Sequence, residues 1–181
     1  MEYYASHPLC TDKAWLQEQD SVAEFCQGRG LDPGAGNRTF SAETVCLDMH
    51  PQSPEVRQGD ATNLPFEESE FDYVINSHLI EHLPNPRIAI CEWLRVVKPG
   101  GHLCMIIPDT THTRGMNTDK TAHRFEWVAR EFVIDVLGIQ LGELDPWFTA
   151  KGRLSWCAGE VVLADVSLDQ WSFCVVIRKV E

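Results

Sequence analysis

The chain has 181 residues, of which 44% are hydrophobic and 23% charged, values typical of one folded globular domain and not of a disordered segment. Fifteen Lys and Arg against 27 Asp and Glu give a formal net charge of −12. A chain this acidic lacks the overall positive charge with which proteins attract nucleic acids and anionic membranes nonspecifically. We therefore expect no nucleic acid and no membrane among its partners.

The seven cysteines contain no C-x-x-C pair, and their number is odd. This usage predicts reduced thiols in a cytoplasmic protein, since disulfides persist in oxidising compartments. No apolar run approaches the roughly 20 residues that span a bilayer. The first ten residues lack the basic and then apolar pattern of a signal peptide. We expect a cytoplasmic protein.

The first third of the chain predicts one helix and three short strands. Apolar residues at helical spacing predict a helix over 12–26, within an N-terminal helical segment 1–27. A strand at Leu31-Asp32 leads into the Gly-rich turn 33–36. Two further short strands are expected at 44–47 and 56–58.

The middle of the chain continues the alternation of strand and helix. An apolar, β-branched run predicts a central strand over 71–76. Helical stretches are expected at 79–83 and 87–97. Lys98-Pro-Gly-Gly101 is typical of a tight turn, because Pro favours its second position and Gly tolerates positive φ at its third. A buried strand follows at 103–107.

The last third begins with a polar segment, 108–124, that is long enough to cover a binding site. A helix is expected over 127–137, followed by a hairpin of strands 160–165 and 171–179. The pattern predicts a single α/β domain over 1–181. Its expected architecture is a Rossmann-like, open and mostly parallel twisted sheet with helices on both faces and a C-terminal antiparallel hairpin. The first βα crossover is shortened.

In an open α/β sheet, ligands bind at the carboxyl ends of the strands. Asp32 and the turn Gly34-Ala-Gly36 follow the first strand, and Asp48 and Asp60 follow the next two. The glycines do not extend into the G-x-G-x-x-G of a dinucleotide site, and there is no phosphate-binding G-x-x-x-x-G-K-[ST]. The set favours a nucleoside site without pyrophosphate, although each carboxylate alone is also compatible with a solvated strand end.

Four segments in this order resemble a known family. They are LDPGAG (31–36), VCLDMHP (45–51), QGDATNLPFEESEFDYVINSHLIEHLPNP (58–86) and LRVVKPGGHLCMIIPD (94–109). The family is the class I S-adenosylmethionine-dependent methyltransferases, in the type 11 group that includes enzymes of the ubiquinone-biosynthesis type. The final hairpin, which ends in SFCVVIRK (172–179), fits the family's last two strands.

The resemblance implies S-adenosylmethionine as cofactor, S-adenosylhomocysteine as product and a small molecule as substrate. It implies cofactor contacts by Asp32, Gly34, Ala35, Gly36, Asp48, Met49, Asp60, Ala61, Asn76 and Ser77. Within this set, Asp48 would bind the ribose hydroxyls and Asp60 would bind the adenine amino group. Met49 and Ala61 would lie against adenine, and Asn76 and Ser77 would face the substrate.

Two features depart from the family pattern. Arg38 stands at the third position of the usual G-x-G-x-G. Only 12 positions separate Gly36 from Asp48, which leaves little room for a helix between the first two strands. The site would then be closed by the N-terminal helix or by a second subunit, which is compatible with a homodimer.

The string His78-Leu-Ile-Glu81-His82 places three polar side chains on one face if this stretch is an α-helix. His78 and His82 are candidates for a catalytic general base, since imidazole titrates near neutral pH. His112 and His123 lie on the polar segment that could cover the site. We expect no metal; Glu81 and His82 are weak candidate ligands, too few for a site by themselves.

The sequence thus predicts a methyltransferase that transfers a methyl group to a small or medium-sized molecule whose acceptor atom is open. The alternative is a catalytically inactive, methyltransferase-like binding or scaffold protein. The short first crossover and the residue Arg38 motivate this alternative, whereas Asp48 and Asp60 oppose it. A nicotinamide-dependent oxidoreductase is a third and weaker reading.

Overall fold

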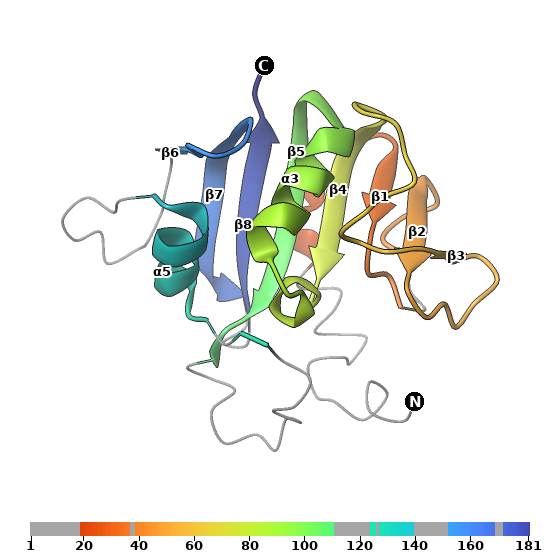
Figure 1. Cartoon of the computed structure of the whole chain (residues 1–181), viewed down its shortest axis with the longest axis horizontal. Coiled ribbons are helices and arrows are strands. Elements are labelled where there is room, and N and C mark those ends of the chain that lie inside the picture. The colour runs from red at the N-terminus through yellow and green to blue at the C-terminus, as the bar shows by residue number, and fades with distance from the viewer. Residues whose placement is uncertain (1–18, 37–38, 111–123, 126, 140–151, 169–171) are drawn as a thin grey trace.

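The computed structural model describes residues 19–36, 39–110, 124–125, 127–139, 152–168 and 172–181. The start of the predicted N-terminal helix, Arg38, and most of the polar segment with His112 and His123 lie outside these residues. Within them, one sheet has the strand order β3-β2-β1-β4-β5-β8-β7-β6 (Figure 1). The strands are β1 (Gly30–Asp32), β2 (Thr44–Asp48), β3 (Arg57–Gln58), β4 (Phe71–Ser77), β5 (Val97–Pro108), β6 (Gly152–Arg153), β7 (Gly159–Leu168) and β8 (Ser172–Lys179).

Strands β1 to β5 pair in parallel with one another, whereas each pairing that involves β6, β7 or β8 is antiparallel. β1 pairs in parallel with both β2 and β4, and β4 pairs in parallel with β5. β8 then runs antiparallel to β5 and to β7. The predicted α/β sheet with a C-terminal antiparallel hairpin is confirmed. The strand order reverses at β1, so the crevice at the carboxyl ends of β1 and β4 is where ligands bind in such sheets.

One face of the sheet carries the larger core. Helix α3 (Pro86–Val96) and the helical pair α5 (Ala129–Glu131) and η4 (Phe132–Leu137) lie in front of the strands (Figure 1). In α3, Asn85 caps the first turn by accepting from the Ile88 N–H at 3.3 Å, and Pro86 begins the helix. The same helix buries Ile90, Trp93 and Leu94 against the sheet.

The opposite face holds a smaller core, under the short helix η2 (Ala23–Phe25). Along β4 the side chains alternate, so that Val74 joins the first core while Tyr73 and Ile75 join the second. The described residues between β1 and β2 contain no helix. The shortened first crossover is therefore confirmed.

Two local predictions need correction, and one strand was missed. The helix predicted over 79–83 is the three-residue 3-10 helix η3 (Ile80–His82). The segment 98–101, predicted as a separate turn, lies within β5 as a bulge-like irregularity, since the pairing with β4 shifts from Phe71–Val97 to Tyr73–His102. Gly100 has the predicted positive φ, 82°. Edge strand β6 was not predicted, because a two-residue strand leaves no periodic pattern.

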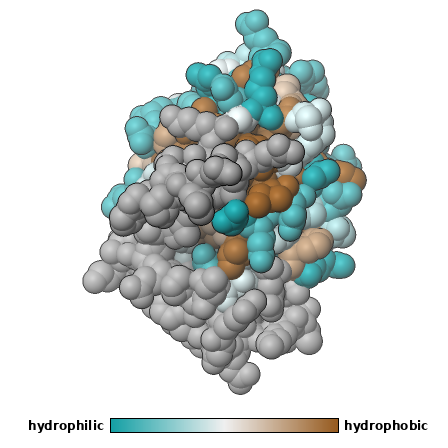
Figure 2. Space-filling view, turned by 90° about the vertical axis from the view of Figure 1, so that its left-hand side faces the viewer, coloured by the Kyte–Doolittle hydropathy of each residue, from teal (hydrophilic) through white to brown (hydrophobic). Residues whose placement is uncertain are grey.

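Where the view from the β6 side shows described residues, hydrophilic and hydrophobic areas are mixed, with hydrophobic residues showing beside the grey segments (Figure 2). Large hydrophobic residues exposed among those described are Met49, Ile88 and Ile134. Among the described helices, none is long and apolar enough to cross a membrane.

The contact between β1 and β4 requires glycine at position 30. A Cβ there would lie 2.1 Å from Cζ of the Tyr73 ring. Tyr73 is fully buried and held at its hydroxyl by Thr44 Oγ1, 2.8 Å away, so the ring has little room to move. We predict that Gly30→Ala lowers the free energy of unfolding by about 2 kcal/mol or more, measured by urea denaturation.

Gly152→Ala is the matched control for this prediction. Its Cβ would meet its nearest neighbour, Ile139 Cγ2, at 3.4 Å, an ordinary van der Waals contact. We expect its free energy of unfolding to stay within about 0.5 kcal/mol of the parent. Equal stability of both variants would contradict the packing argument.

Candidate cofactor-binding site

One backbone hydrogen bond joins the turn after β1 to the end of β2, and a second bond, to the Asp32 side chain, closes the turn itself. The Ala35 N–H donates to the Leu47 carbonyl at 3.2 Å, and the Gly34 N–H donates to Asp32 Oδ1 at 3.2 Å. A Cβ at Gly34 would come within 2.7 Å of Leu79 Cδ2, so glycine lets this turn pack against the segment after β4. The predicted residues Asp32, Gly34 and Ala35 thus form one compact turn at the sheet's carboxyl edge.

Gly36 and Asp48 are joined directly. Gly36 has φ of 59°, a backbone conformation that favours glycine, and no atom of the described residues, its chain neighbours aside, lies within 4 Å of the position its Cβ would take. Its N–H donates to Asp48 Oδ2 at 3.0 Å, while Asp48 Oδ1 accepts from the His50 N–H at 2.8 Å. An ionised carboxylate has about four acceptor positions, so Asp48 retains capacity for two hydroxyl groups.

The pKa of Asp32 is raised from 3.8 to about 7. The main cause is burial, which disfavours the charged carboxylate, and the nearby negative charge of Asp48 adds to it. The hydrogen bond from Gly34 acts in the opposite direction. A cation placed beside these two carboxylates would relieve their repulsion.

Asp60 lies beyond β3 on an exposed loop. Its Oδ1 accepts from the Thr62 N–H and from Thr62 Oγ1, both at 2.7 Å. The neighbouring Ala61 is buried, and its carbonyl accepts from the Trp93 indole N–H at 2.8 Å. Met49, expected beside adenine, is 52% exposed in the absence of ligand.

The end of β4 presents Asn76 and Ser77. Asn76 is completely buried, and among the described residues neither its amide nitrogen nor its amide oxygen has a hydrogen-bond partner. Buried polar groups are nearly always hydrogen-bonded, so this amide calls for a water molecule or a ligand group. Ser77 is partly exposed at the strand end.

The two histidines flank a buried carboxylate. Glu81 is 1% exposed, and its Oε1 lies 3.9 Å from His78 Nδ1 and 3.7 Å from His82 Nε2. His78 Nε2 lies 3.3 Å from the hydroxyl of Ser172, at the start of β8. His78 has φ of 55°, uncommon for a residue with a side chain and frequent at functional sites.

The structure corrects how these three side chains come together. His78 precedes η3, so the expected α-helical face through His78, Glu81 and His82 does not form. The left-handed turn at His78 brings its ring beside Glu81 instead. Ser172 was missed by the sequence analysis because it lies 94 positions from His78 in the chain. Among the described residues, no group of three or more metal-ligating side chains is arranged to hold a metal ion.

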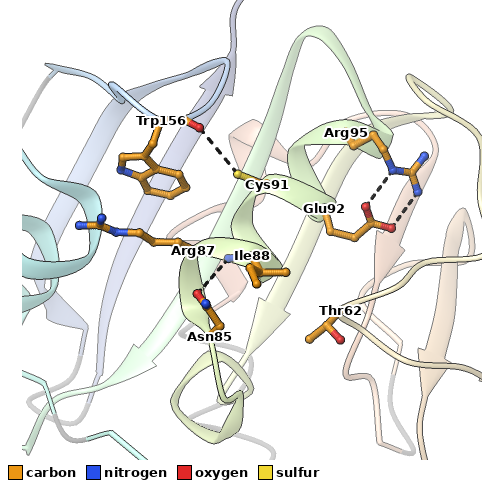
Figure 3. A pocket seen from close by; sticks show the side chains of 8 residues that line it. All are labelled: Thr62, Asn85, Arg87, Ile88, Cys91, Glu92, Arg95 and Trp156. Atoms are coloured by element: carbon orange, nitrogen blue, oxygen red, sulfur yellow. Dashed lines mark hydrogen bonds and ion pairs between the residues drawn. The ribbon is translucent and has the colours of Figure 1, made fainter.

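A hollow on the surface lies away from these strand ends. It has a volume of about 560 Å³ and lies over the outer side of α3, between Trp156 and Thr62 (Figure 3). None of the predicted cofactor residues lines it. The strand ends, where the polar groups converge, are the better candidate site.

The residues present at the strand ends fit an adenosyl cofactor. Gly36 leaves open space beside its backbone, Asp48 has spare acceptor capacity, and Asn76 needs a polar partner. The acidic pair Asp32 and Asp48 suits a cationic group.

Comparisons with known proteins agree with this geometry. A methyltransferase-domain family matches residues 18–105. The fold is similar to that of a Thermotoga maritima protein described as a SAM-dependent methyltransferase and possible histamine N-methyltransferase, with a TM-score of 0.60 and 20% identity over 93% of this chain and 90% of that one. Residues 18–105 are therefore similar to the methyltransferase-domain family, and the chain has the fold of S-adenosylmethionine-dependent methyltransferases.

Two further similarities fall within this methyltransferase family. A demethylmenaquinone methyltransferase from Desulfitobacterium hafniense is 36% identical over 81 residues, 45% of this chain. The 1,6-didemethyltoxoflavin-N1-methyltransferase of Burkholderia thailandensis, solved with S-adenosylhomocysteine, has a TM-score of 0.62 and 13% identity over 99% of this chain and 84% of that one. The chain spans about a third of the curated relatives' lengths, 32% and 35% for the first two.

The raised pKa of Asp32 predicts a pH-dependent stability. Between about pH 4 and 7 the folded protein binds a proton at Asp32 that the unfolded chain releases, so this group's contribution falls as the pH rises. We predict that Asp32→Asn is more stable than the parent at pH 8, by about 1–2 kcal/mol after allowance for partial exposure.

The measurement is urea denaturation of both proteins at pH 4 and pH 8 without ligand. The two should have nearly equal stability at pH 4, where Asp32 is protonated in the folded parent. A variant that is less stable than the parent at pH 8 would show that the ionised carboxylate is well accommodated.

Proposed function

We propose that this protein transfers the methyl group of S-adenosylmethionine to a small or medium-sized molecule. The observation that carries the proposal is the meeting of the Gly36 turn and Asp48 at the sheet's carboxyl edge, joined by a 3.0 Å hydrogen bond. The turn leaves space for a ligand, and the carboxylate can accept from ribose hydroxyls. Asp60 follows the next strand, and we assign to it the recognition of the adenine amino group.

The charge of the site favours this cofactor over a dinucleotide. Asp32, Asp48 and Asp60 all follow strands at one edge of the sheet. S-adenosylmethionine carries a sulfonium and an ammonium, which these carboxylates attract. A pyrophosphate would be repelled by the same groups, and the turn lacks the third glycine of a dinucleotide fingerprint.

S-Adenosylmethionine supplies an activated methyl group, so the protein mainly has to orient the acceptor and remove its proton. Holding two reactants in line contributes much of the acceleration in such bimolecular reactions. We propose His78 and His82 as general bases beside Asn76 and Ser77. Glu81 lies close enough to both rings to stabilise the imidazolium that forms when either accepts a proton.

The partners we propose are a small-molecule acceptor and, for closure of the site, a second copy of the chain. Demethylmenaquinone methyltransferases among the relatives act on the small molecule in their name. The net charge of −12 supports the absence of nucleic acid from this list.

S-Adenosylhomocysteine should stabilise the folded protein. At a concentration 100 times its dissociation constant, a ligand adds about 2.7 kcal/mol to the free energy of unfolding, which shifts the melting temperature by roughly 5–10 °C. We expect this shift with S-adenosylhomocysteine and none with NAD. Asp48→Ala should abolish most of it by removing the ribose acceptor.

Asp135→Ala, which removes an exposed carboxylate on η4, is the matched control and should keep the full shift. A shift of equal size in Asp48→Ala would show that the site is elsewhere. No shift in the parent protein at millimolar S-adenosylhomocysteine would favour the inactive scaffold instead.

If His78 or His82 is the general base, its substitution should lower the turnover rate without weakening cofactor binding. We would screen phenols, amines and thiols with radiolabelled S-adenosylmethionine and then assay His78→Asn, since Asn tolerates the positive φ of this position. We expect kcat to fall by about 10²–10⁴-fold with S-adenosylhomocysteine affinity within roughly twofold of the parent. Full turnover in both His78→Asn and His82→Asn would exclude a base at these positions.

A further inference from the structure

The loop over Gly59–Phe66 joins β3 to the approach of β4 and carries Asp60. It contains no strand of the sheet, only an isolated bridge between Asp60 and Asn63. Much of its backbone is held by side chains from the last turns of α3. These bonds determine where the adenine-recognising carboxylate lies.

Trp93 holds the loop at Ala61. Its side chain is completely buried in the main core, and its indole N–H donates to the Ala61 carbonyl at 2.8 Å. A buried tryptophan normally needs a partner for this N–H, so its position in the core fixes the carbonyl as well. Ala61 adjoins Asp60, so this bond acts one residue from the carboxylate.

Glu92 and Arg95 hold the loop farther along. Glu92 Oε1 accepts from the Leu64 N–H at 2.8 Å. Arg95 donates to the carbonyls of Phe66 and Leu64 at 2.9 and 3.2 Å. The two side chains also form a two-point ion pair, with both N–O distances 2.8 Å, on the side of α3 that faces the loop carrying Thr62 (Figure 3).

The ion pair is built to persist. The Arg95 guanidinium lowers the pKa of Glu92, so the carboxylate stays ionised at neutral pH. A two-point pair holds both groups in one plane, which is the geometry in which Arg binds carboxylates most firmly. Glu92 and Arg95 therefore present a fixed acceptor and fixed donors to the loop backbone.

Asp60 is oriented within the loop that these bonds hold. Its Oδ1 accepts from the Thr62 N–H and hydroxyl, and its own carbonyl accepts from the Asn63 N–H at 3.1 Å. Every partner of Asp60 named here thus belongs to the loop itself. The loop can place the carboxylate accurately only if the loop as a whole is held in place.

We propose that Trp93, Glu92 and Arg95 are positioning residues that hold Asp60 and Ala61 for recognition of adenine. The proposal rests on the proposed function, because it assumes that Asp60 binds the adenine amino group. It adds that the base preference of the site is determined from α3, a helix that itself supplies no predicted cofactor contact. Loss of these bonds should weaken adenine binding while the fold survives.

The test measures the affinity of the full chain for S-adenosylhomocysteine and for its hypoxanthine analogue, S-inosylhomocysteine, by calorimetry. Hypoxanthine has an oxygen where adenine has the amino group, so an aspartate acceptor disfavours it. We expect Trp93→Phe, which keeps an aromatic ring but removes the N–H, to bind S-adenosylhomocysteine about tenfold more weakly. We also expect a smaller preference for adenine over hypoxanthine.

Trp156→Phe is the matched control. Trp156 also donates its indole N–H to a backbone carbonyl, that of Leu137 at 3.2 Å, but lies on the other side of α3 from Thr62 (Figure 3). The Trp156→Phe variant should keep both the parent's affinity for S-adenosylhomocysteine and its preference for adenine over hypoxanthine. Arg95→Lys, which loses the planar group that reaches two loop carbonyls, should behave like Trp93→Phe and carries the test if Trp93→Phe does not fold.

The outcomes separate the two proposals. A folded Trp93→Phe or Arg95→Lys variant with the parent's affinity and base preference would overturn the positioning role while leaving the cofactor site intact. A parent protein that does not bind S-adenosylhomocysteine at all would overturn the proposed function and this inference with it. Circular dichroism melting establishes which variants are folded.

Discussion

The site depends on the position of β1, a strand of only three residues that is hydrogen-bonded to β2 on one side and β4 on the other. Because all three strands run parallel, their carboxyl ends meet at one edge and bring Asp32, Asp48 and Asn76 within one region. Gly30 makes this possible, since the Tyr73 ring occupies the space beside its Cα. The part of the sheet that positions the site thus depends on close packing at the short central strand β1.

The short crossover between β1 and β2 changes how the cofactor turn is supported. The described part of this crossover contains no helix, and the turn is held at the end of β2 by the Leu47 carbonyl and the Asp48 carboxylate. Asp48 thereby has two tasks, since it fixes the Gly36 backbone and is the acceptor proposed for ribose. A similar arrangement holds on the far side of β3, where α3 side chains bind the loop that carries Asp60.

Most strands and the choice of strand ends could be predicted from the sequence, because buried parallel strands such as 71–76 are continuous apolar runs and the carboxylates follow them directly. The local conformation of His78 could not be predicted from the sequence, since a positive φ at a residue other than glycine has no reliable sequence signal. The contacts of Ser172 with His78 and of Trp93 with Ala61 join residues distant in the chain. For Trp93, the available signal was that a buried indole N–H needs a hydrogen-bond partner.

The most direct test of the account is to follow the backbone amide signals of the isotope-labelled protein by NMR as S-adenosylhomocysteine is added. The account predicts the largest changes at Gly34, Gly36, His50 and Thr62, whose amides donate to Asp32, Asp48 or Asp60. Signals of Ile88 and Cys91, which line the hollow over α3, should change little. Changes centred on that hollow, with the strand-end amides unaffected, would contradict a cofactor site at the carboxyl edge of the sheet.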